Sequence, residues 1–189
     1  MLKKILIALA LLIAGFAAVV AMQPSEFRVE RTATVAAPPA SVFAHVDDLH
    51  KWEAWSPWAK LDPTAKVAYE GAPAGKGAGF TWSGNDKVGE GRMTIVKSRP
   101  AELVDIKVDF TRPFAGSNSS TFTFKPEGDG TAVTWSMSGH QNFLEKAVCL
   151  VMNGKKMIGD QLDQGPRAIE KRGRKEGLNP VRPLQMPAV

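Results

Sequence analysis

Five segments in which apolar and polar residues alternate limit the possible folds more than any other feature, and they cover residues 78–83, 89–98, 102–111, 117–126 and 131–139. A period of two places every second side chain on one face of a strand. The separators between the segments are short and rich in Gly, Pro, Asn and Asp, which favours hairpins between sequential strands. The sequence therefore predicts an antiparallel sheet with one apolar and one polar face.

Two earlier segments, 27–35 and 66–70, extend this pattern and bring the predicted sheet to seven strands. Between them, Pro38 and Pro39 open a short helix over 40–48. The helix is followed by Trp52, Trp55 and Trp58, which are three of the five tryptophans in the chain. So much aromatic mass on so short an element must either cover a core or roof a cavity.

From Asn142 onward, apolar residues recur at helical spacing, namely Leu144, Val148, Val151, Ile158, Leu162 and Ile169. This stripe predicts a long helix that packs across the apolar face of the sheet. Gly165 and Pro166 predict a kink or an end of the helix near Gln164. The remaining segment, 171–189, is basic, contains three prolines after Gly177 and is expected to be a disordered tail.

The N-terminus determines the expected location. Residues 5–22 form an uncharged apolar run preceded by Lys3 and Lys4, long enough for a membrane anchor. Small residues around 19–21 also fit cleavage by a signal peptidase. In both cases the lysines stay in the cytoplasm, so the body is expected on the periplasmic or extracellular side, anchored if uncleaved and secreted if cleaved. The predicted organisation is an anchor or signal segment at 1–24, a domain at 25–170 and the tail at 171–189.

The formal net charge of +5 is located at the ends of the chain. Lys3 and Lys4 contribute +2 and residues 170–189 contribute +3, which leaves the body neutral. A surface that binds nucleic acid needs clustered cations, so we expect no nucleic-acid partner. Cys149 is the single cysteine, and no Cys or His pair has zinc-like spacing. No metal and no cofactor is therefore expected.

Several stretches resemble the START-like or SRPBCC superfamily, which includes polyketide cyclase/dehydrase-like and Bet v 1-like proteins. The matching stretches are 37–43, 46–48, 52–58, 80–84 and 89–91, and the resemblance extends over about 27–164. It implies an α+β helix-grip fold, in which a curved antiparallel sheet of about seven strands wraps around a long C-terminal helix. It also implies an apolar cavity for lipids, sterols or polyketides, but no particular reaction, because the superfamily mixes binders with enzymes.

The apolar phase of the strands and the helix stripe predict the residues that would contact a hydrophobic ligand: Trp55, Phe80, Trp82, Met93, Ile106, Phe110, Phe122, Phe124, Trp135, Met137 and Val151. No catalytic residue is assigned, because the carboxylates in mid-strand fall on the polar face. His45, His50 and His140 would each need a partner inside the cavity to act as a base. Arg31 interrupts the apolar phase of its strand and is expected at the mouth of the sheet.

Three functions follow as hypotheses. The first is a membrane-tethered binding or carrier domain for a hydrophobic small molecule or lipid. The second is a polyketide cyclase or aromatase type of enzyme, and the third is a protein-interaction domain with a filled core. A void surrounded by Phe80, Trp82, Ile106, Phe122 and Trp135 would distinguish the first two hypotheses from the third.

Overall fold

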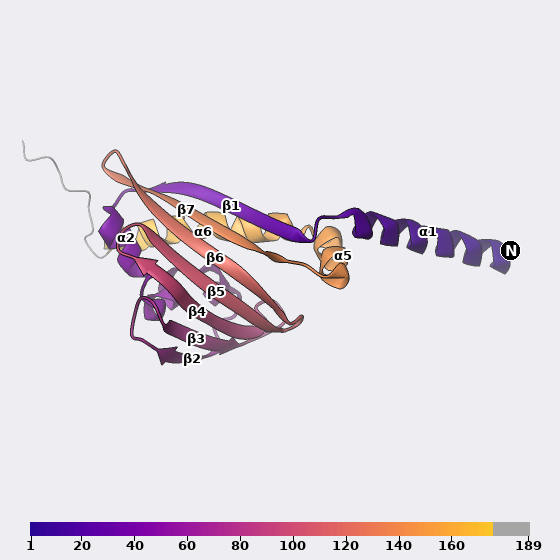
Figure 1. Ribbon diagram of the computed structural model, residues 1–189, viewed down its shortest axis with the longest axis horizontal. Helices are drawn as coiled ribbons and strands as arrows, with labels where there is room; N and C mark the ends of the chain where they lie inside the picture. The colour runs from indigo at the N-terminus through magenta and orange to yellow at the C-terminus, as the bar shows by residue number, and fades with distance from the viewer. Residues whose placement is uncertain (176–189) are drawn as a thin grey trace, which may run out of the picture.

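The computed structural model describes residues 1–175, and seven antiparallel strands form one curved sheet at its centre (Figure 1). The strands follow the order β1-β7-β6-β5-β4-β3-β2. Their bounds are β1 Glu26–Val35, β2 Lys66–Gly71, β3 Ala78–Ser83, β4 Glu90–Arg99, β5 Leu103–Arg112, β6 Gly116–Glu127 and β7 Gly130–His140. Each predicted strand is present within one residue of its expected ends, which confirms the assignment from the period of two.

One face of the sheet, here called the inner face, carries the apolar phase of every strand. In β5, Val104, Ile106 and Val108 are buried, whereas Lys107 on the opposite face is exposed. Directly opposite residues share a face in an antiparallel pair, so the pairing of Val104 with Phe122 extends the apolar surface into β6. This surface needs a cover of helices to exclude water.

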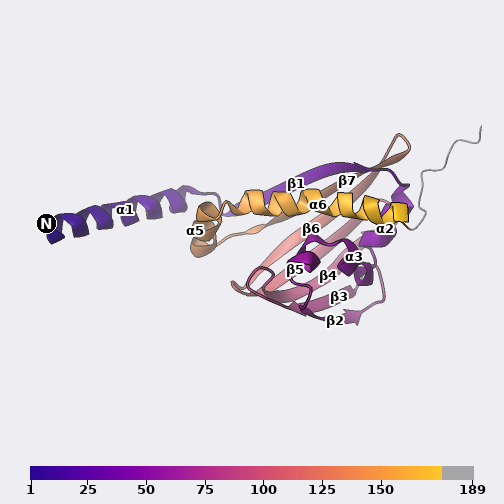
Figure 2. The same ribbon diagram turned by 180° about the vertical axis from the view of Figure 1, so that it is seen from behind.

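The cover consists of four α-helices and one 3-10 turn on the inner face (Figure 2). They are α2 Pro39–Val46, η1 Leu49–Lys51, α3 Trp52–Trp55, α4 Pro57–Leu61 and α6 Gly154–Lys175. A further helix, α5 Phe143–Val151, precedes α6 and lies beside the end of α1. The longest, α6, lies along β1 and β7 and also contacts α2, α3 and α4. The expected helix-grip arrangement is thereby confirmed.

The predicted long helix is divided earlier than its sequence indicates. Its break lies at Met152 and Asn153, and Asn153 has the left-handed φ of 52° that asparagine tolerates better than most residues. Because the chain turns here, α5 packs beside α1 while α6 packs on the sheet. The stripe is therefore split, so Ile158, Leu162 and Ile169 pack against the core, whereas Leu144 and Val151 are exposed.

The predicted helix end near Gln164 was wrong, because α6 continues through Pro166 to Lys175, and the alternative of a kink at this point stays a prediction. Gly165 and Pro166 are both buried, and a side chain on Gly165 would collide with the ring of Trp135. Packing onto the sheet thus outweighs the local preference of proline to end a helix. The helix also includes residues 171–175 of the expected disordered tail, and the rest of that tail lies outside the described residues.

The apolar N-terminal segment forms α1, Leu2–Met22, which extends away from the body (Figure 1). Its length and hydropathy are sufficient to cross a membrane, and they fit a signal sequence as well. Only its last turn meets the body, where Val20 is fully buried.

Asp62, at the end of α4, joins two turns beside β2 and β3. Its carboxylate accepts hydrogen bonds from the Thr64 hydroxyl at 2.7 Å, from the Thr64 N–H at 3.1 Å and from the Asn85 N–H at 2.7 Å. The Thr64 hydroxyl, followed by the Asn85 N–H, holds the pKa of Asp62 below its ordinary value of 3.8.

We expect Asp62→Asn to lower the free energy of unfolding at neutral pH, because the amide N–H₂ would face the Asn85 N–H donor. A carboxyl whose folded pKa is lowered stabilises the fold above its unfolded pKa, and this stabilisation is lost as the pH falls through the folded pKa. The difference between parent and variant should therefore shrink in acid. Denaturant unfolding at a series of pH values tests this, and a difference that stays constant with pH would contradict it.

Candidate functional site

The tryptophan segment forms the roof over the sheet, and hydrogen bonds fix two of its rings. The Trp52 indole N–H donates to the carbonyl of Val46 and the Trp55 indole N–H donates to that of His45, both at 2.9 Å. Both rings are almost fully buried. A buried indole needs a partner for its N–H, so these bonds allow the two rings to point inward at no loss of hydrogen bonding.

Below the roof, the tryptophan rings pack directly on the sheet. Trp135 of β7 stacks on Phe122 of β6, with ring centroids 4.5 Å apart. Trp52, Trp55 and Trp58 surround Trp135 edge-on at 6.4, 5.8 and 5.4 Å. These separations are normal for packed aromatic pairs. The tryptophans thus occupy the space between α6 and the β6–β7 half of the sheet, where a ligand cavity was expected.

Two further contacts, with Ser120 and with α6, hold the Trp135 ring in place. Its indole N–H donates to the Ser120 hydroxyl at 2.8 Å, and Ser120 is itself buried. On the other side the ring touches the backbone of α6 at Gly165. Only glycine permits an approach this close, which explains a glycine within a helix.

The β2–β5 half of the inner face is less covered, and we call its apolar side chains the aromatic wall. The wall consists of Val67, Tyr69, Phe80, Trp82, Met93 and Phe110, which the strand pairing places on one face. Tyr69, Phe80, Trp82 and Phe110 form a chain of ring contacts at 5.9, 6.0 and 5.5 Å. None of the six is fully buried, and Val67 and Tyr69 remain 46% and 42% exposed. This wall is the candidate ligand-binding surface.

The predicted ligand contacts divide into three groups. Six are closed to water within the packed core: Trp55, Ile106, Phe122, Phe124, Trp135 and Met137. Four belong to the half-buried wall: Phe80, Trp82, Met93 and Phe110. Val151 is 72% exposed on α5, away from the sheet, because the break at Asn153 removes it from the covering helix. Its expected place in the stripe that packs across the apolar face of the sheet was wrong.

Sequence reasoning omitted two members of the wall, Val67 and Tyr69 of β2. They alternate with Lys66 and Ala68, so the period of two already places them on one face. Burial raises the pKa of the Tyr69 hydroxyl, and the negative charges of Glu53 and Asp48 raise it further. Tyr69 therefore presents a neutral hydroxyl at the edge of an apolar surface.

The three histidines lie in different environments. Among residues 1–175, no group of three or more His, Cys, Asp or Glu side chains is placed to hold a metal ion. His45 is buried in α2, and His140 lies exposed at the end of β7. His50 stacks on Tyr69 with ring centroids 4.0 Å apart, and its Nδ1 lies 3.3 Å from the Asp48 carboxylate. His50 is thus the histidine that borders the wall.

Arg31, which was expected at the mouth of the sheet, reaches α6. Its Nε donates to the Asp163 carboxylate at 3.1 Å, and its guanidinium crosses α6 beside Gly159. Because both side chains are about two-fifths exposed, this pair contributes little to stability. It is one of several contacts between β1 and α6.

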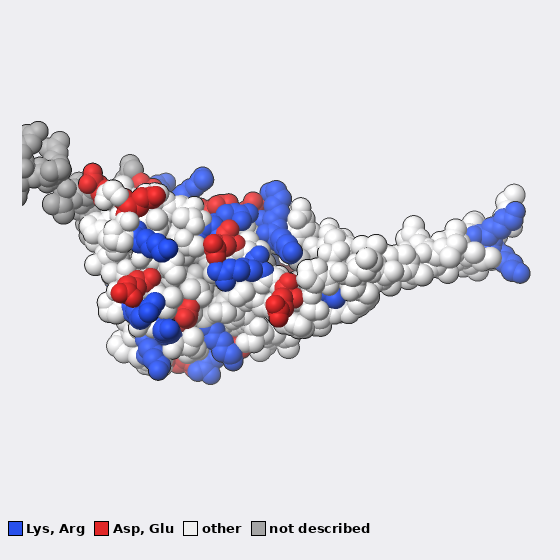
Figure 3. Space-filling view, turned by 45° about the horizontal axis from the view of Figure 1, so that its top comes forward, with Lys and Arg blue, Asp and Glu red and all other residues white. Residues whose placement is uncertain are grey.

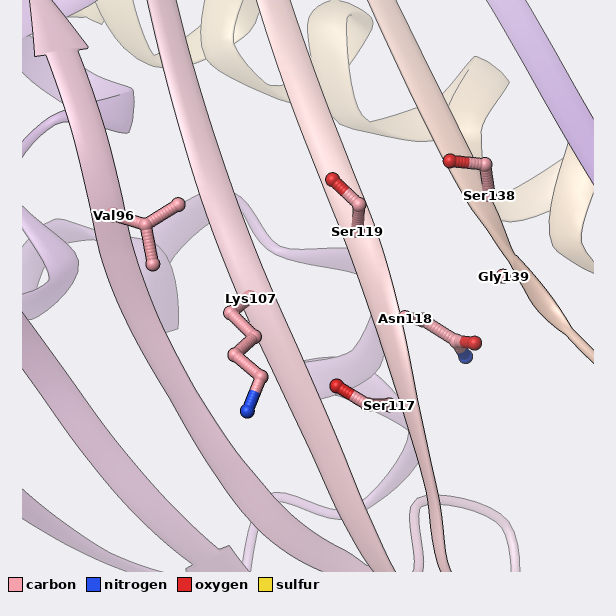
Figure 4. Close-up of a pocket in the computed structure, with 7 residues that line it drawn as sticks. All are labelled: Val96, Lys107, Ser117, Asn118, Ser119, Ser138 and Gly139. Carbon is pink, nitrogen blue, oxygen red and sulfur yellow. The ribbon is translucent and has the colours of Figure 1, made fainter.

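The outer face of the sheet carries hollows of a different character. One, of about 410 Å³, is lined mainly by the polar residues Lys107, Ser117, Asn118, Ser119 and Ser138, together with Val96 and Gly139 (Figure 4). A second, of about 310 Å³, lies across β2–β5 and includes Lys66, Glu90 and Arg92. Their lining lacks the continuous apolar surface of a site for a hydrophobic ligand.

Acidic and basic side chains are interspersed over the face of the body that Figure 3 shows, whereas the extended α1 is uncharged except at its tip. Surface ion pairs such as Arg92 with Glu70 and Lys107 with Asp109 produce this mixture. The charges agree with the neutral body expected from the sequence.

Solved structures of similar fold share little sequence identity with this chain. The protein TTHA0849 from Thermus thermophilus has a TM-score of 0.57 at 16% identity, over 79% of this chain and 99% of its own. MLL2253 from Mesorhizobium loti has a TM-score of 0.56 at 19% identity, over 77% and 98%. Ara h 8.0201 has a TM-score of 0.51 at 15% identity, over 79% and 99%. At these identities the similarity shows the fold alone.

Sequence comparison identifies the family directly. No protein with a curated record matches the chain. Residues 26–170 match the model of the family described as polyketide cyclase / dehydrase and lipid transport, which covers β1 to α6 and leaves α1 outside. The match, the seven-stranded sheet and the covering helix agree, and we conclude that the chain belongs to the polyketide cyclase/dehydrase and lipid transport family of the SRPBCC superfamily.

Proposed function

We propose that this protein is a membrane-tethered binding or carrier domain for a hydrophobic small molecule or lipid, and that the ligand binds on the aromatic wall. The supporting observation is the contrast between the two halves of one sheet face. Tryptophans close the β6–β7 half, whereas the six apolar side chains of the wall stay partly open to solvent. A contiguous apolar surface of this kind typically marks a binding site.

The geometry of the wall favours a flat or elongated apolar ligand. Trp82 lies over Gly91, where a side chain would collide with the ring, so the floor of the wall is flat at this point. Its polar groups lie at the rim, namely the Tyr69 hydroxyl and the imidazole of His50. Such a surface would hold an acyl chain or a ring system by apolar contact and orient a polar end with few hydrogen bonds.

The tether and its orientation are part of the same proposal. α1 has the length of a bilayer span, and Lys3 and Lys4 at its N-terminal end are retained on the cytoplasmic side. The body then lies on the exported side, next to a membrane that supplies hydrophobic ligands. Attachment to the membrane keeps the aromatic wall close to the hydrophobic molecules that the membrane contains.

Photo-crosslinking tests where the ligand binds. The full-length protein in nanodiscs is irradiated with a long-chain fatty acid that carries a diazirine, and the labelled peptides are identified by mass spectrometry. We expect labelling of 78–83 and 90–112 that excess unlabelled fatty acid prevents. Phe110→Ala should weaken this labelling about tenfold, because it removes roughly 60 Å² of apolar contact at about 25 cal/mol per Å². Val96→Ala, on the outer face, is the matched control.

Labelling confined to α1, or equal loss in the Phe110 and Val96 variants, would contradict the binding site. A probe that labels the core peptides of β6 and β7 instead would show that the tryptophan cluster opens.

The enzyme hypothesis keeps one specific observation in its favour. The Asp48 carboxylate lies beside His50 Nδ1 at the border of the wall, and such a pair can orient an imidazole as a general base. Native mass spectrometry of the protein extracted from its own membrane distinguishes the two functions. A carrier should retain the same ligand in the parent and in His50→Gln, whereas an enzyme should retain an unreacted ligand of different mass in the variant.

A further inference from the structure

Four large apolar side chains of α5 are exposed, which departs from the usual arrangement of a surface helix, whose apolar side chains face the core. Phe143, Leu144 and Val151 are 53%, 56% and 72% exposed, and Leu150 lies on the same side. The charged residues of α5 face the body instead, since Lys146 is buried and Glu145 is partly buried. Met152 and Met157 are each more than half exposed and continue the apolar surface into α6.

The buried polar residues hold α5 at the end of α1. The Lys146 ammonium donates to the Gln23 carbonyl at 3.1 Å, and the Gln141 N–H donates to the Ser25 carbonyl at 2.7 Å. Asn142 and Glu145 form a capping box that starts α5 at this point. α5 therefore occupies a defined position beside the last turn of α1, as both ribbon views show (Figures 1 and 2).

The length of α1 determines how deep α5 lies relative to the membrane when α1 spans it. A helix of 21 residues spans about 31 Å, close to the roughly 30 Å of the hydrocarbon core of a bilayer. When α1 spans the membrane, its last turn reaches the boundary between acyl chains and headgroups, and α5 lies at the same level. Lys155 and Lys156 follow directly in the first turn of α6, where cations meet lipid headgroups.

From these observations we infer that α5 is an interfacial helix whose outward face, Phe143, Leu144, Leu150 and Val151, inserts into the lipid surface next to α1. This inference rests on the membrane tether proposed above. It assigns α5 a second contact with the membrane, which fixes the orientation of the body instead of leaving it to rotate about a single helix. An interfacial helix buries its apolar face at the acyl boundary in the same manner.

Spin-label depth measurements test this contact. In a Cys149→Ala background, single cysteines are introduced by Val151→Cys, Leu144→Cys, Leu11→Cys and Val96→Cys and labelled with a nitroxide. All four native side chains are at least 46% exposed, so the labels require no repacking, and unchanged thermal unfolding confirms the fold. Each full-length variant is placed at one copy per nanodisc of phosphatidylcholine and phosphatidylglycerol, so that a second copy cannot cover α5.

Labels at 151 and 144 should be accessible to oxygen and lose accessibility to a water-soluble nickel complex, as the label at 11 does, while the label at 96 stays water-accessible. If the label at 11 lies in lipid but those at 151 and 144 match the label at 96, the tether stands and the contact of α5 is overturned. Water access at position 11 would overturn the tether and this inference together.

Discussion

Trp135→Ala should destabilise the protein by about 3–5 kcal/mol, the cost of removing a large aromatic side chain from a packed core. Trp135 is 1% exposed and contacts Phe122 and the three tryptophans of the roof. Its removal also leaves the buried Ser120 hydroxyl without its indole donor. Denaturant unfolding of the full-length protein in mild detergent, followed by circular dichroism, measures the effect.

Trp82→Ala is the matched control, because Trp82 is only partly buried on the aromatic wall. Its substitution should cost clearly less in stability and should instead weaken ligand labelling. An equal loss of stability in the two variants would show that the wall is packed as tightly as the roof. In that case the filled-core hypothesis of a protein-interaction domain would be preferred.

Gly165→Ala should destabilise the protein by about 1–3 kcal/mol, the range for overpacking a core. The added Cβ would lie 2.3 Å from the Trp135 ring, which is enclosed by other aromatic rings and cannot withdraw. The effect opposes helix propensity, because alanine is favoured over glycine in a helix by about 1 kcal/mol.

Gly159→Ala, earlier in α6, provides the comparison. Its Cβ would meet the end of the flexible Arg31 side chain, which is partly exposed and can move. We therefore expect no loss of stability, or a gain of up to about 1 kcal/mol from propensity. Thermal unfolding of both variants tests the contrast, and a stabilised Gly165 variant would contradict the close contact between α6 and Trp135.

The alternation of apolar and polar residues along β3 to β7 was sufficient to predict the sheet, because this alternation can be read from consecutive residues of the chain. It also predicted the correct face for Ile106, Phe122 and Trp135. It could not predict whether that face encloses a void, because side chains from α3 and α4 fill the space only after the chain has folded. The residues of the exposed wall and those of the closed core follow the same alternation of apolar and polar residues, so the alternation does not distinguish them.

The C-terminal helices illustrate the same limit. The local sequence at Gly165 and Pro166 predicts a helix end. Packing of this segment against Trp135 nevertheless keeps α6 continuous. Asn153 carries no strong signal, yet the left-handed turn at this residue directs α5 to α1 and Val151 away from the sheet.

The sequence alone was sufficient to predict four features: the seven strands, the apolar N-terminal helix, the neutral body and the family resemblance. Each of them depends on composition or on the spacing of residues along the chain. The three-dimensional packing was needed to learn which aromatic side chains are closed in and which stay open as the wall. It was also needed to learn that the apolar face of α5 points outward beside α1. Burial is a property of the elements packed around a residue, and those elements come from distant parts of the chain.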